Sequence, residues 1–511
     1  MKHKGFYIAL FVLTVMLLAF PAVQQYARLF KLRPLAGATV VTERPQLNVG
    51  TFMKGDFQRQ EDQYLSENIG FRELFVRSYN QLCWSLFRKV QNKTIFISDD
   101  NWIFNDFTIK HHYGQSVYDF GDTNEAVVEK MHASALMLRQ LQELLKEYGV
   151  SFFVCLAPGK DMVCEEHLPE VEGFDRPPGV LAIDYFPPMF DSLGINYLNL
   201  SDYYMQIKDT VSYPLYLKSS SHWSNLAAAY VSDTLIHYME QLSGLNMHDL
   251  RYSEPYQAYT RVPDADLESL LNLMYPIETD TYTYTTVTLD DDSTSVKPRW
   301  LVVGDSYYWE FQYNLPMNRL FDSYHYWYYN STIHNDPLHN NVRQVDILNE
   351  LLSTDIVMLI YSPCNLYDLN RQFLTNALYN FYFDDARIKA KFEKLKQDIR
   401  NNAPWYAQVE ENAEEQGKTV EQSLDDEARY MLYNFPGYYF QEFKTAEVAT
   451  SRNPRIDQVL SYLNDPERTR YRKEMLNNPE WLNAVKEKAA ASNITIDEAI
   501  ERDIDWILQR P

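Results

Sequence analysis

The sequence predicts an α/β fold, a three-layer sandwich in which helices cover both faces of a mainly parallel sheet. Short apolar runs lie at 150–157, 300–304 and 355–361, and helical sequence lies among them. Continuous apolar runs of this length are typical of strands that are buried on both faces, as in parallel sheets. Strands that alternate with helices then favour the α/β sandwich.

The periodicity of apolar residues predicts the individual elements in turn. A long helix is expected between Asp122 and Tyr148, where apolar residues recur at helical spacing and Gly149 is placed to end the helix. The strand 150–157 follows directly and stops at Pro158-Gly159. The same reasoning predicts a strand edge at 101–104, a strand at 195–199, a helix at 225–239 and a strand at 281–289.

The amino terminus predicts a membrane segment. Residues 5–27 carry no charge, and the only earlier side-chain charges are Lys2 and Lys4. The run is long enough to span a bilayer, and basic residues before it keep the amino end in the cytoplasm. We therefore expect a single-pass anchor with the main domain outside the cytoplasm; a cleaved signal peptide is the alternative.

The chain of 511 residues is long for one domain and divides into four predicted segments. These are a membrane anchor or signal segment at 1–27, a tether at 28–50, the α/β domain at 51–375 and a helical module at 376–511.

The helical module contains an internal repeat at a constant offset of 76 residues. Asn401-Asn-Ala-Pro-Trp405 corresponds to Asn477-Asn-Pro-Glu-Trp481, and Thr419-Val-Glu corresponds to Thr495-Ile-Asp. Leu424 and Ile500 keep the register, as do Tyr430 and Trp506. A repeated helical unit with few candidate catalytic groups predicts a packing or partner module without chemistry of its own.

Composition and charge exclude several classes of function. The formal net charge is −23, whereas binding to nucleic acid depends on a positive surface. The four cysteines show no C-x-x-C or Cys/His spacing, so no metal site and no cofactor is predicted. The 39 tyrosines and 9 tryptophans fit either an ordinary core or a surface that stacks on sugar rings.

The strand 300–304 leads into the candidate reactive residue. It ends on the turn Gly304-Asp305-Ser306, and parallel strands place ligands just beyond their carboxyl ends. A serine there can attack an acyl carbon if a base takes its proton. His222, in Lys218-Ser-Ser-Ser-His222-Trp223, is the candidate base. The alternative is that Gly-Asp-Ser is only a turn, because these residues favour turns.

These segments together resemble the alginate O-acetyltransferase family. The resemblance lies in Tyr64-Leu65 with Asn68-Ile-Gly-Phe-Arg72, in Ala157-Pro-Gly-Lys160, and in a His-Trp pair that precedes Gly-Asp-Ser, and it covers roughly 45–375. It implies an SGNH-hydrolase-like domain that faces the periplasm and is anchored in the inner membrane. It further implies acetyl transfer to a polysaccharide, with a membrane-bound O-acyltransferase as the donor partner.

The resemblance implies that Ser306 is the nucleophile and His222 the base. The family motif is Asp-x-His-Trp, and this chain has Ser220 at the position of the aspartate. Because the acid of a triad orients the imidazole and stabilises its charged form, its loss can cost about four orders of magnitude in rate. Three accounts remain open: another carboxylate such as Asp202 or Asp209, a slow Ser–His dyad, or a degenerate site that only binds polysaccharide.

Several neighbouring residues have expected roles of lower consequence. Tyr307, Trp309 and Trp223 are candidates to line a glycan groove, or are simply core. Lys160 is expected to be a solvent-facing loop lysine, and Asp305 to bond the backbone of its turn. The sequence thus predicts an O-acetyltransferase acting on a cell-surface or secreted polysaccharide. The alternatives are an acetyl esterase with the same chemistry and a non-catalytic polysaccharide-binding or export-complex protein.

Overall fold

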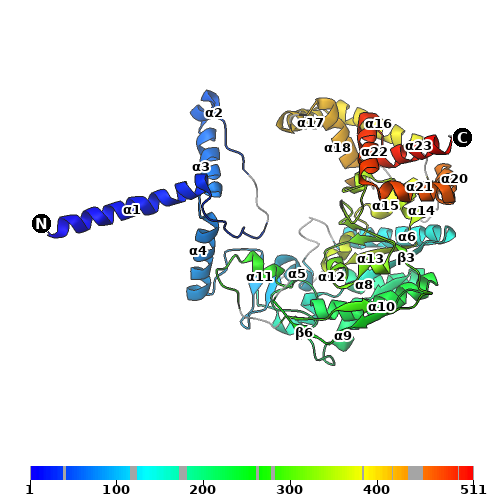
Figure 1. Cartoon of the computed structure of the whole chain (residues 1–511), viewed down its shortest axis with the longest axis horizontal. Coiled ribbons are helices and arrows are strands. Elements are labelled where there is room, and N and C mark those ends of the chain that lie inside the picture. The colour runs from blue at the N-terminus through cyan, green and yellow to red at the C-terminus, as the bar shows by residue number, and fades with distance from the viewer. Residues whose placement is uncertain are drawn as a thin grey trace.

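The structure is a computed structural model. It describes residues 2–37, 42–115, 124–171, 181–259, 264–277, 282–382, 385–416, 418–434, 453–492 and 494–509. Figure 1 shows a long helix at the amino end that projects from the body, a central body that contains the sheet, and a group of helices at the carboxyl end.

A six-stranded sheet forms the centre of the body, in the order β11-β10-β9-β12-β3-β4. Every neighbouring pair is parallel except β10 and β11, which are antiparallel. The strands are β3 (Ser151–Leu156), β4 (Tyr197–Asn199), β9 (Arg299–Gly304), β10 (Ser323–Tyr328), β11 (Thr332–His334) and β12 (Ile356–Tyr361). The apolar runs predicted to be buried strands are β3, β9 and β12, which lie side by side at the centre of the sheet.

Alternate residues of these strands enter two different cores. Leu301 and Val303 of β9 belong to the cluster on one face, whereas Trp300 and Val302 belong to the cluster on the other. This alternation follows from the two-residue period of a strand. The first face is covered by α6 (Asn124–Glu147), α8 (Ala182–Leu193), α14 (Ile347–Ser353) and α15 (Phe373–Tyr382), and the second by α10 (Asn225–Ser243) and α12 (Tyr308–Asn314). The predicted α/β sandwich is therefore confirmed.

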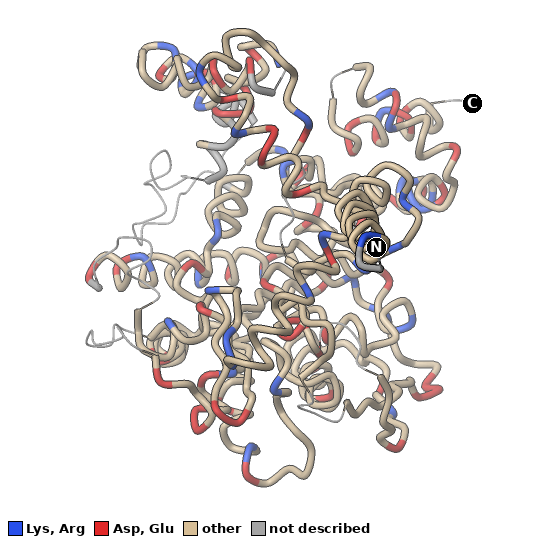
Figure 2. The backbone as a smooth tube through the Cα atoms, turned by 90° about the vertical axis from the view of Figure 1, so that its left-hand side faces the viewer, with Lys and Arg blue, Asp and Glu red and all other residues tan. Residues whose placement is uncertain are grey.

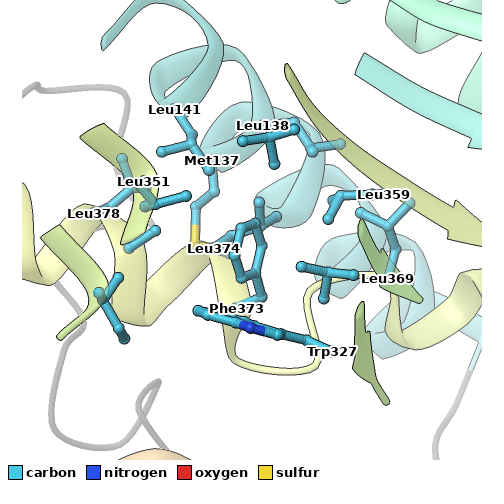
Figure 3. Packing of buried hydrophobic residues seen from close by; sticks show 14 of the residues in the cluster. Met137, Leu138, Leu141, Trp327, Leu351, Leu359, Leu369, Phe373, Leu374 and Leu378 are labelled. Carbon is cyan, nitrogen blue, oxygen red and sulfur yellow. The ribbon is translucent and has the colours of Figure 1, made fainter. Parts of the chain in front are cut away.

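Figure 3 shows the core of the first face. Leu138 and Leu141 of α6 point toward Leu374 of α15, with Leu359 of β12 and Trp327 of β10 close by. The predicted helix 122–148 is α6; Asp122 itself lies outside the described residues. Its apolar positions Val127, Met131, Leu138, Leu141 and Leu145 are all buried.

The predicted strand 281–289 lies outside the central sheet. Within the described residues it is two short strands, β7 (Thr283–Tyr284) and β8 (Val287–Leu289), which pair antiparallel with β6 (Tyr256–Gln257) and β5 (Leu250–Tyr252). The physical reason is the alternation of threonine with apolar residues, which suits a strand with one solvent-facing side. The remaining elements of the body are β1 (Ile95–Ile97), β2 (Ile103–Asn105), α5 (Asp106–His112), α7 (Lys160–Val163), α9 (Leu200–Ile207), α11 (Asp266–Leu270) and α13 (Met317–Leu320).

The amino-terminal part consists of four helices. These are α1 (Lys2–Ala27), α2 (Val49–Lys54), α3 (Asp56–Asn68) and α4 (Arg72–Phe87). Among the described residues, one helical stretch is long and apolar enough to cross a membrane, Lys4–Ala27, with a mean hydropathy of 2.5. The segment predicted as a tether is held to the body: Arg77 donates to the carbonyls of Arg33 and Pro34, and the amide of Ala36 donates to Asn272.

The carboxyl-terminal part is helical, as the sequence predicts. It contains α16 (Asp385–Asn401), α17 (Ala403–Gln416), α18 (Val420–Asn434), α20 (Arg455–Leu463), α21 (Pro466–Leu476), α22 (Pro479–Ser492) and α23 (Ile496–Leu508). Residues related by the offset of 76 share their burial, as in the pairs Val409 and Val485, Ala413 and Ala489, and Leu424 and Ile500. The side chain of Tyr430 lies outside the described part. Figure 2 shows acidic and basic residues interspersed along the tube in this view.

Candidate active site

The strand β9 delivers Ser306 to the carboxyl edge of the sheet. Gly304 is paired with Ile360 of β12, and a Cβ atom at Gly304 would lie 2.0 Å from the carbonyl oxygen of Ile360. Only glycine fits at this close approach. The chain then turns through Asp305 and Ser306 into α12. The serine is therefore placed where parallel sheets present their functional groups.

Asp305 fixes the shape of this turn from beneath. Its carboxylate accepts hydrogen bonds from the amide of Tyr307 at 3.2 Å, from the amide and hydroxyl of Ser362 at 2.8 and 2.7 Å, and from the side-chain amide of Asn365 at 2.8 Å. The side chain is completely buried. The prediction that Asp305 bonds the backbone of its own turn is confirmed.

His222 lies directly against Ser306. The distance between His222 Nε2 and Ser306 Oγ is 2.7 Å, which is the separation required of a nucleophile and its base. The imidazole comes from the loop before α10, a helix capped by the side chain of Ser224, and it packs edge-on against the ring of Tyr307. Two residues far apart in the sequence thus meet as the motifs predict.

Ser220 occupies the family's aspartate position but serves the loop. Its Oγ accepts a hydrogen bond from the backbone amide of His222 at 3.0 Å, and its side chain is fully buried. At this contact it shapes the backbone rather than the ring. A serine here therefore does not reproduce the charge that an aspartate would bring.

Two carboxylates that the sequence did not single out approach the other ring nitrogen. Asp266 Oδ2 lies 3.5 Å and Glu310 Oε1 lies 3.7 Å from His222 Nδ1. The two carboxylates suggested by proximity in the sequence are not partners of the ring. Asp202 instead accepts a hydrogen bond from Asn199 at the start of α9, and Asp209 is not among the neighbours of the imidazole.

The hydroxyl of Ser221 connects Asp266 to the imidazole. Ser221 donates its amide to Asp266 Oδ1 at 2.8 Å and its hydroxyl to Asp266 Oδ2, while Ser221 Oγ lies 3.2 Å from His222 Nδ1. A serine has one hydroxyl proton, and an ionised carboxylate only accepts. Because that proton goes to Asp266, the oxygen of Ser221 is left to accept the Nδ1 proton of His222. This tautomer leaves Nε2 free to accept the proton of Ser306.

Glu310 is a different kind of carboxyl group. It lies in α12, it is completely buried, and neither of its carboxyl oxygens has a hydrogen-bond partner among the described residues. Burial raises the pKa of Glu310 well above its usual value, and the charges of Asp264 and Asp266 act in the same direction. Burial thus favours the neutral form of Glu310.

A cavity of about 520 Å³ opens over the serine and histidine. Its wall includes Ser306, His222, Tyr307, Ser221 and further residues of four segments of the chain: Asn105, Phe107, Thr108, Lys110, Gly159, Lys160, Asp161, Tyr329, Ser362, Pro363, Cys364, Asn365, Tyr367, Asp368 and Arg371. A second cavity of about 290 Å³ shares Tyr329, Asp368 and Arg371 with the first. Polar side chains and backbone continue along it, among them Asn330, Ser331, Asn341, Arg343 and Asn376.

The three aromatic residues proposed for a glycan groove lie in different surroundings. Tyr307 lines the cavity, with its hydroxyl donating to the carbonyl of Ser221. Trp223 is buried in the core, where it packs against Phe311. Trp309 packs against Tyr326 and is not on the wall of either cavity. Of the two alternatives for the tryptophans, groove or core, the structure favours the core, because the loop and the helix that carry them turn their rings toward the sheet.

Lys160 is also placed differently from the prediction. It is 1% exposed rather than solvent-facing, and its ammonium donates to the carbonyls of Ile103, Lys218 and Ser220. The lysine thereby fixes the loop that carries His222. The Ala-Pro-Gly-Lys segment gave no signal for this role, because the three carbonyls come from distant parts of the sequence.

The fold and these groups define an SGNH-hydrolase-like domain with a serine and a histidine in direct contact. Residues 99–318 match the family model described as "SGNH hydrolase-like domain, acetyltransferase AlgX". The matched residues include both Ser306 and His222. The resemblance inferred from the motifs is thereby confirmed.

Solved structures are similar to this chain over about half of its length. The O-acetyltransferase domain of Pseudomonas putida AlgJ has 15% identity and a TM-score of 0.36, over 55% of this chain and 98% of that one. AlgX of Pseudomonas aeruginosa has 14% identity and a TM-score of 0.35, over 56% and 71%. Bacillus cereus PatB1 with a sulfonyl adduct has 13% identity and a TM-score of 0.34, over 54% and 99%. No curated protein matches, and these distant likenesses add no argument about function.

Proposed function

We propose that this protein is an extracytoplasmic O-acetyltransferase that acetylates hydroxyl groups of a cell-surface or secreted polysaccharide through an acetyl-serine intermediate. The observation that carries the proposal is the 2.7 Å contact between His222 Nε2 and Ser306 Oγ at the base of an open cavity. This contact lies within residues 99–318, the region that matches the AlgX acetyltransferase family model.

The first half-reaction loads the enzyme. His222 Nε2 takes the proton of Ser306 as the serine oxygen attacks the acetyl carbonyl of the donor. The tetrahedral intermediate collapses, the bond to the donor oxygen breaks, and His222 returns the proton to that oxygen. Acetyl-Ser306 and the free donor alcohol remain.

The second half-reaction transfers the acetyl group. A sugar hydroxyl enters the cavity, gives its proton to His222 and attacks the ester carbon. The ester bond to Ser306 breaks, and His222 returns the proton to the serine. Water in place of the sugar gives hydrolysis, so an acetyl esterase uses the same groups and differs only in its acceptor.

The acid that supports His222 is assigned to Asp266, acting through Ser221. The chain Asp266–Ser221–His222–Ser306 runs through contacts that keep the Nδ1 proton in place and point Nε2 at the nucleophile. Asp266 touches no reacting atom and is a positioning residue. Glu310 is the less suitable acid, because a neutral carboxyl group brings no charge to stabilise an imidazolium.

The polar second cavity supports an extended acceptor. It shares Tyr329 and Arg371 with the reaction cavity, and Arg371 stacks over the ring of Tyr329 at 4.4 Å. A polar cavity that adjoins the reaction cavity suits the further units of a carbohydrate better than it suits a compact apolar substrate. The proposed donor is an acetylated membrane-bound O-acyltransferase. The proposed location of this protein is the outer face of the inner membrane.

A non-catalytic polysaccharide-binding protein is the second candidate, and the serine at position 220 favours it. The two candidates separate with p-nitrophenyl acetate as the donor. A transferase or esterase turns the ester over, and Ser306→Ala and His222→Ala each reduce turnover to the background rate. Equal hydrolysis by all three proteins would leave only the binding function. Added oligosaccharide that receives acetyl groups distinguishes the transferase from the esterase.

A further inference from the structure

The helix α4 presents an apolar stripe that no part of the described structure covers. Phe75, Tyr79, Leu82 and Leu86 recur at helical spacing and are 49%, 58%, 54% and 64% exposed. Residues at this spacing share one face of a helix. A stripe of four large side chains exposed together differs from single exposed apolar residues, which are common on any surface.

The opposite face of α4 is the one that packs on the body. Trp84 is buried in a cluster with Ile95 and Leu267, and Arg77 holds the segment that leaves α1. The apolar stripe therefore points away from the catalytic domain.

The stripe is continuous with the helix that is apolar enough to cross a membrane. Phe71, directly before α4, lies 5.0 Å from Phe20 of α1 and 6.5 Å from Phe75, measured between ring centroids. A Cβ atom at Gly70 would lie 2.0 Å from the carbonyl oxygen of Pro21, so α4 begins in close contact with the last turns of α1. At 1.5 Å per residue, about 20 residues span the hydrocarbon core. The contact thus falls at the level where α1 leaves the membrane.

The direction of α4 and the charged residues beside its apolar stripe both fit a position at the membrane surface. Figure 1 shows α4 running across the direction of α1 rather than along it. Exposed basic residues flank the stripe, with Arg28, Lys31 and Arg33 near its start and Arg88 and Lys89 at its end. The whole chain has a net charge of −23, yet these basic residues gather beside the apolar stripe. At the surface of a membrane they can contact lipid phosphates.

We propose that α4 lies in the surface of the outer leaflet, with Phe75, Tyr79, Leu82 and Leu86 inserted among the acyl chains. An amphipathic helix in this position buries its apolar face about 5–10 Å into the headgroup and acyl boundary. Because Trp84 and Arg77 bind α4 to the body, the helix holds the catalytic domain at a fixed orientation to the membrane. The proposal depends on the membrane location of α1 and not on the acetyl chemistry.

The test places an environment-sensitive fluorophore on the stripe of the full-length protein. Leu82→Cys and Leu86→Cys are labelled with NBD and reconstituted in vesicles of phosphatidylcholine with phosphatidylglycerol, and insertion of α1 is first verified by flotation. Trp506→Cys, on α23 and 56% exposed, is the matched control. Wild-type protein treated with the same reagent measures the background labelling of the native cysteines. Cys83, Cys155 and Cys164 are buried.

We expect fluorescence at positions 82 and 86 to be quenched by lipids with a nitroxide on the acyl chain, and fluorescence at position 506 to be unaffected. Leu82→Glu with a label at position 86 should lose this quenching while the circular dichroism spectrum of the protein stays unchanged. The proposal is overturned if the labels at 82 and 86 behave like the one at 506 in protein that floats with the vesicles. It is also overturned if they are shielded only when a second membrane protein is added, because the stripe is then a protein interface.

Discussion

Two buried histidines of this molecule meet carboxylates in different ways. At the junction with the carboxyl-terminal helices, His339 Nδ1 lies 2.8 Å from Asp336 and His339 Nε2 lies 3.2 Å from Asp497. Burial lowers the pKa of His339, but the hydrogen bonds and charges of Asp336 and Asp497 outweigh it and raise the pKa to about 9. His339 is thus a fixed cation. His222 has a serine hydroxyl at Nδ1 and the nucleophile at Nε2.

The two sites show that a carboxylate can serve structure at one histidine and catalysis at another. Two direct carboxylates occupy both nitrogens of His339, so neither nitrogen can take a proton from another group. At His222 the hydroxyl of Ser221 stands between the ring and Asp266, so the carboxylate directs the ring while Nε2 stays open. A general base must present a free lone pair to its substrate.

The His339 site lies on a pattern of ion pairs that both copies of the helical repeat share. In the first copy Lys396 pairs with Glu421 at 2.6 Å and with Asp425 at 2.5 Å. The residues 76 positions later, Arg472 with Asp497 and Glu501, make the same pairs. The second copy differs because Asp497 also pairs with His339 of the α/β domain. Both copies therefore contain the same internal ion pairs, and in the second copy Asp497 also contacts the α/β domain through His339.

The largest effect is expected from the acid that supports catalysis. Asp266→Asn should lower kcat for p-nitrophenyl acetate by about two to four orders of magnitude, because the amide can stabilise the wrong imidazole tautomer. The loss should appear in kcat rather than in KM. Asp202→Asn, an exposed carboxylate on α9, is the control and should retain activity. If Glu310→Gln instead causes the large loss, the acid is Glu310 and the comparison fails.

A smaller effect, on stability, is expected at His339. A pKa of about 9 against an ordinary 6.5 corresponds to about 3 kcal/mol of stabilisation. Because the folded-state pKa is raised, this contribution is complete below about pH 6.5 and is lost as the pH rises through 9. His339→Gln should lower the melting temperature at pH 6 and leave it almost unchanged at pH 10, with little change in esterase activity.

His325 changes its charge in the same range of pH. Burial lowers its pKa, but the paired carboxylate of Glu350 outweighs burial and raises the pKa to about 9. Wild type and variant must therefore be compared with each other at each pH. An equal destabilisation at both values of pH would show that His339 contributes packing and not charge.

The bridging hydroxyl should matter less than the acid it contacts. Ser221→Ala removes the hydrogen bond between Asp266 and the imidazole, but leaves the carboxylate 3.5 Å from Nδ1 and able to move closer. We expect a decrease in kcat of about tenfold, corresponding to one ordinary hydrogen bond. Ser221→Thr keeps the hydroxyl and should restore most of the rate. Failure of threonine to restore it would mean that the alanine acts through the loop and not through the ring.

The smallest effect is expected from restoring the family motif. Ser220→Asp brings a carboxylate to a fully buried position whose hydroxyl accepts the amide of His222. Since Asp266 already serves the imidazole, the rate should not rise and is expected to fall slightly. A clear increase in kcat would show that His222 lacks an effective acid in the native protein.

The sequence predicted the parts of this molecule that local patterns encode. The apolar runs gave the central strands, and the order of His222 before Ser306 gave the family. Asp266 was not predictable because it stands in a short acidic stretch without a motif, and the fold brings it to His222 only where the start of α11 contacts the loop before α10. Lys160 was misplaced for a similar reason, since carbonyls of residues 103, 218 and 220 make its burial possible. The exposed face of α4 also depends on which side of the helix packs on the body.

The central claim is tested most directly by trapping the acetyl group. The protein is mixed with p-nitrophenyl acetate, quenched in acid after short times and digested, and the peptide that contains Ser306 is analysed by mass spectrometry. We expect one acetyl group on Ser306, formed more slowly in Asp266→Asn and absent in His222→Ala. Turnover that continues in Ser306→Ala, or an acetyl group found only on lysine side chains, would contradict it.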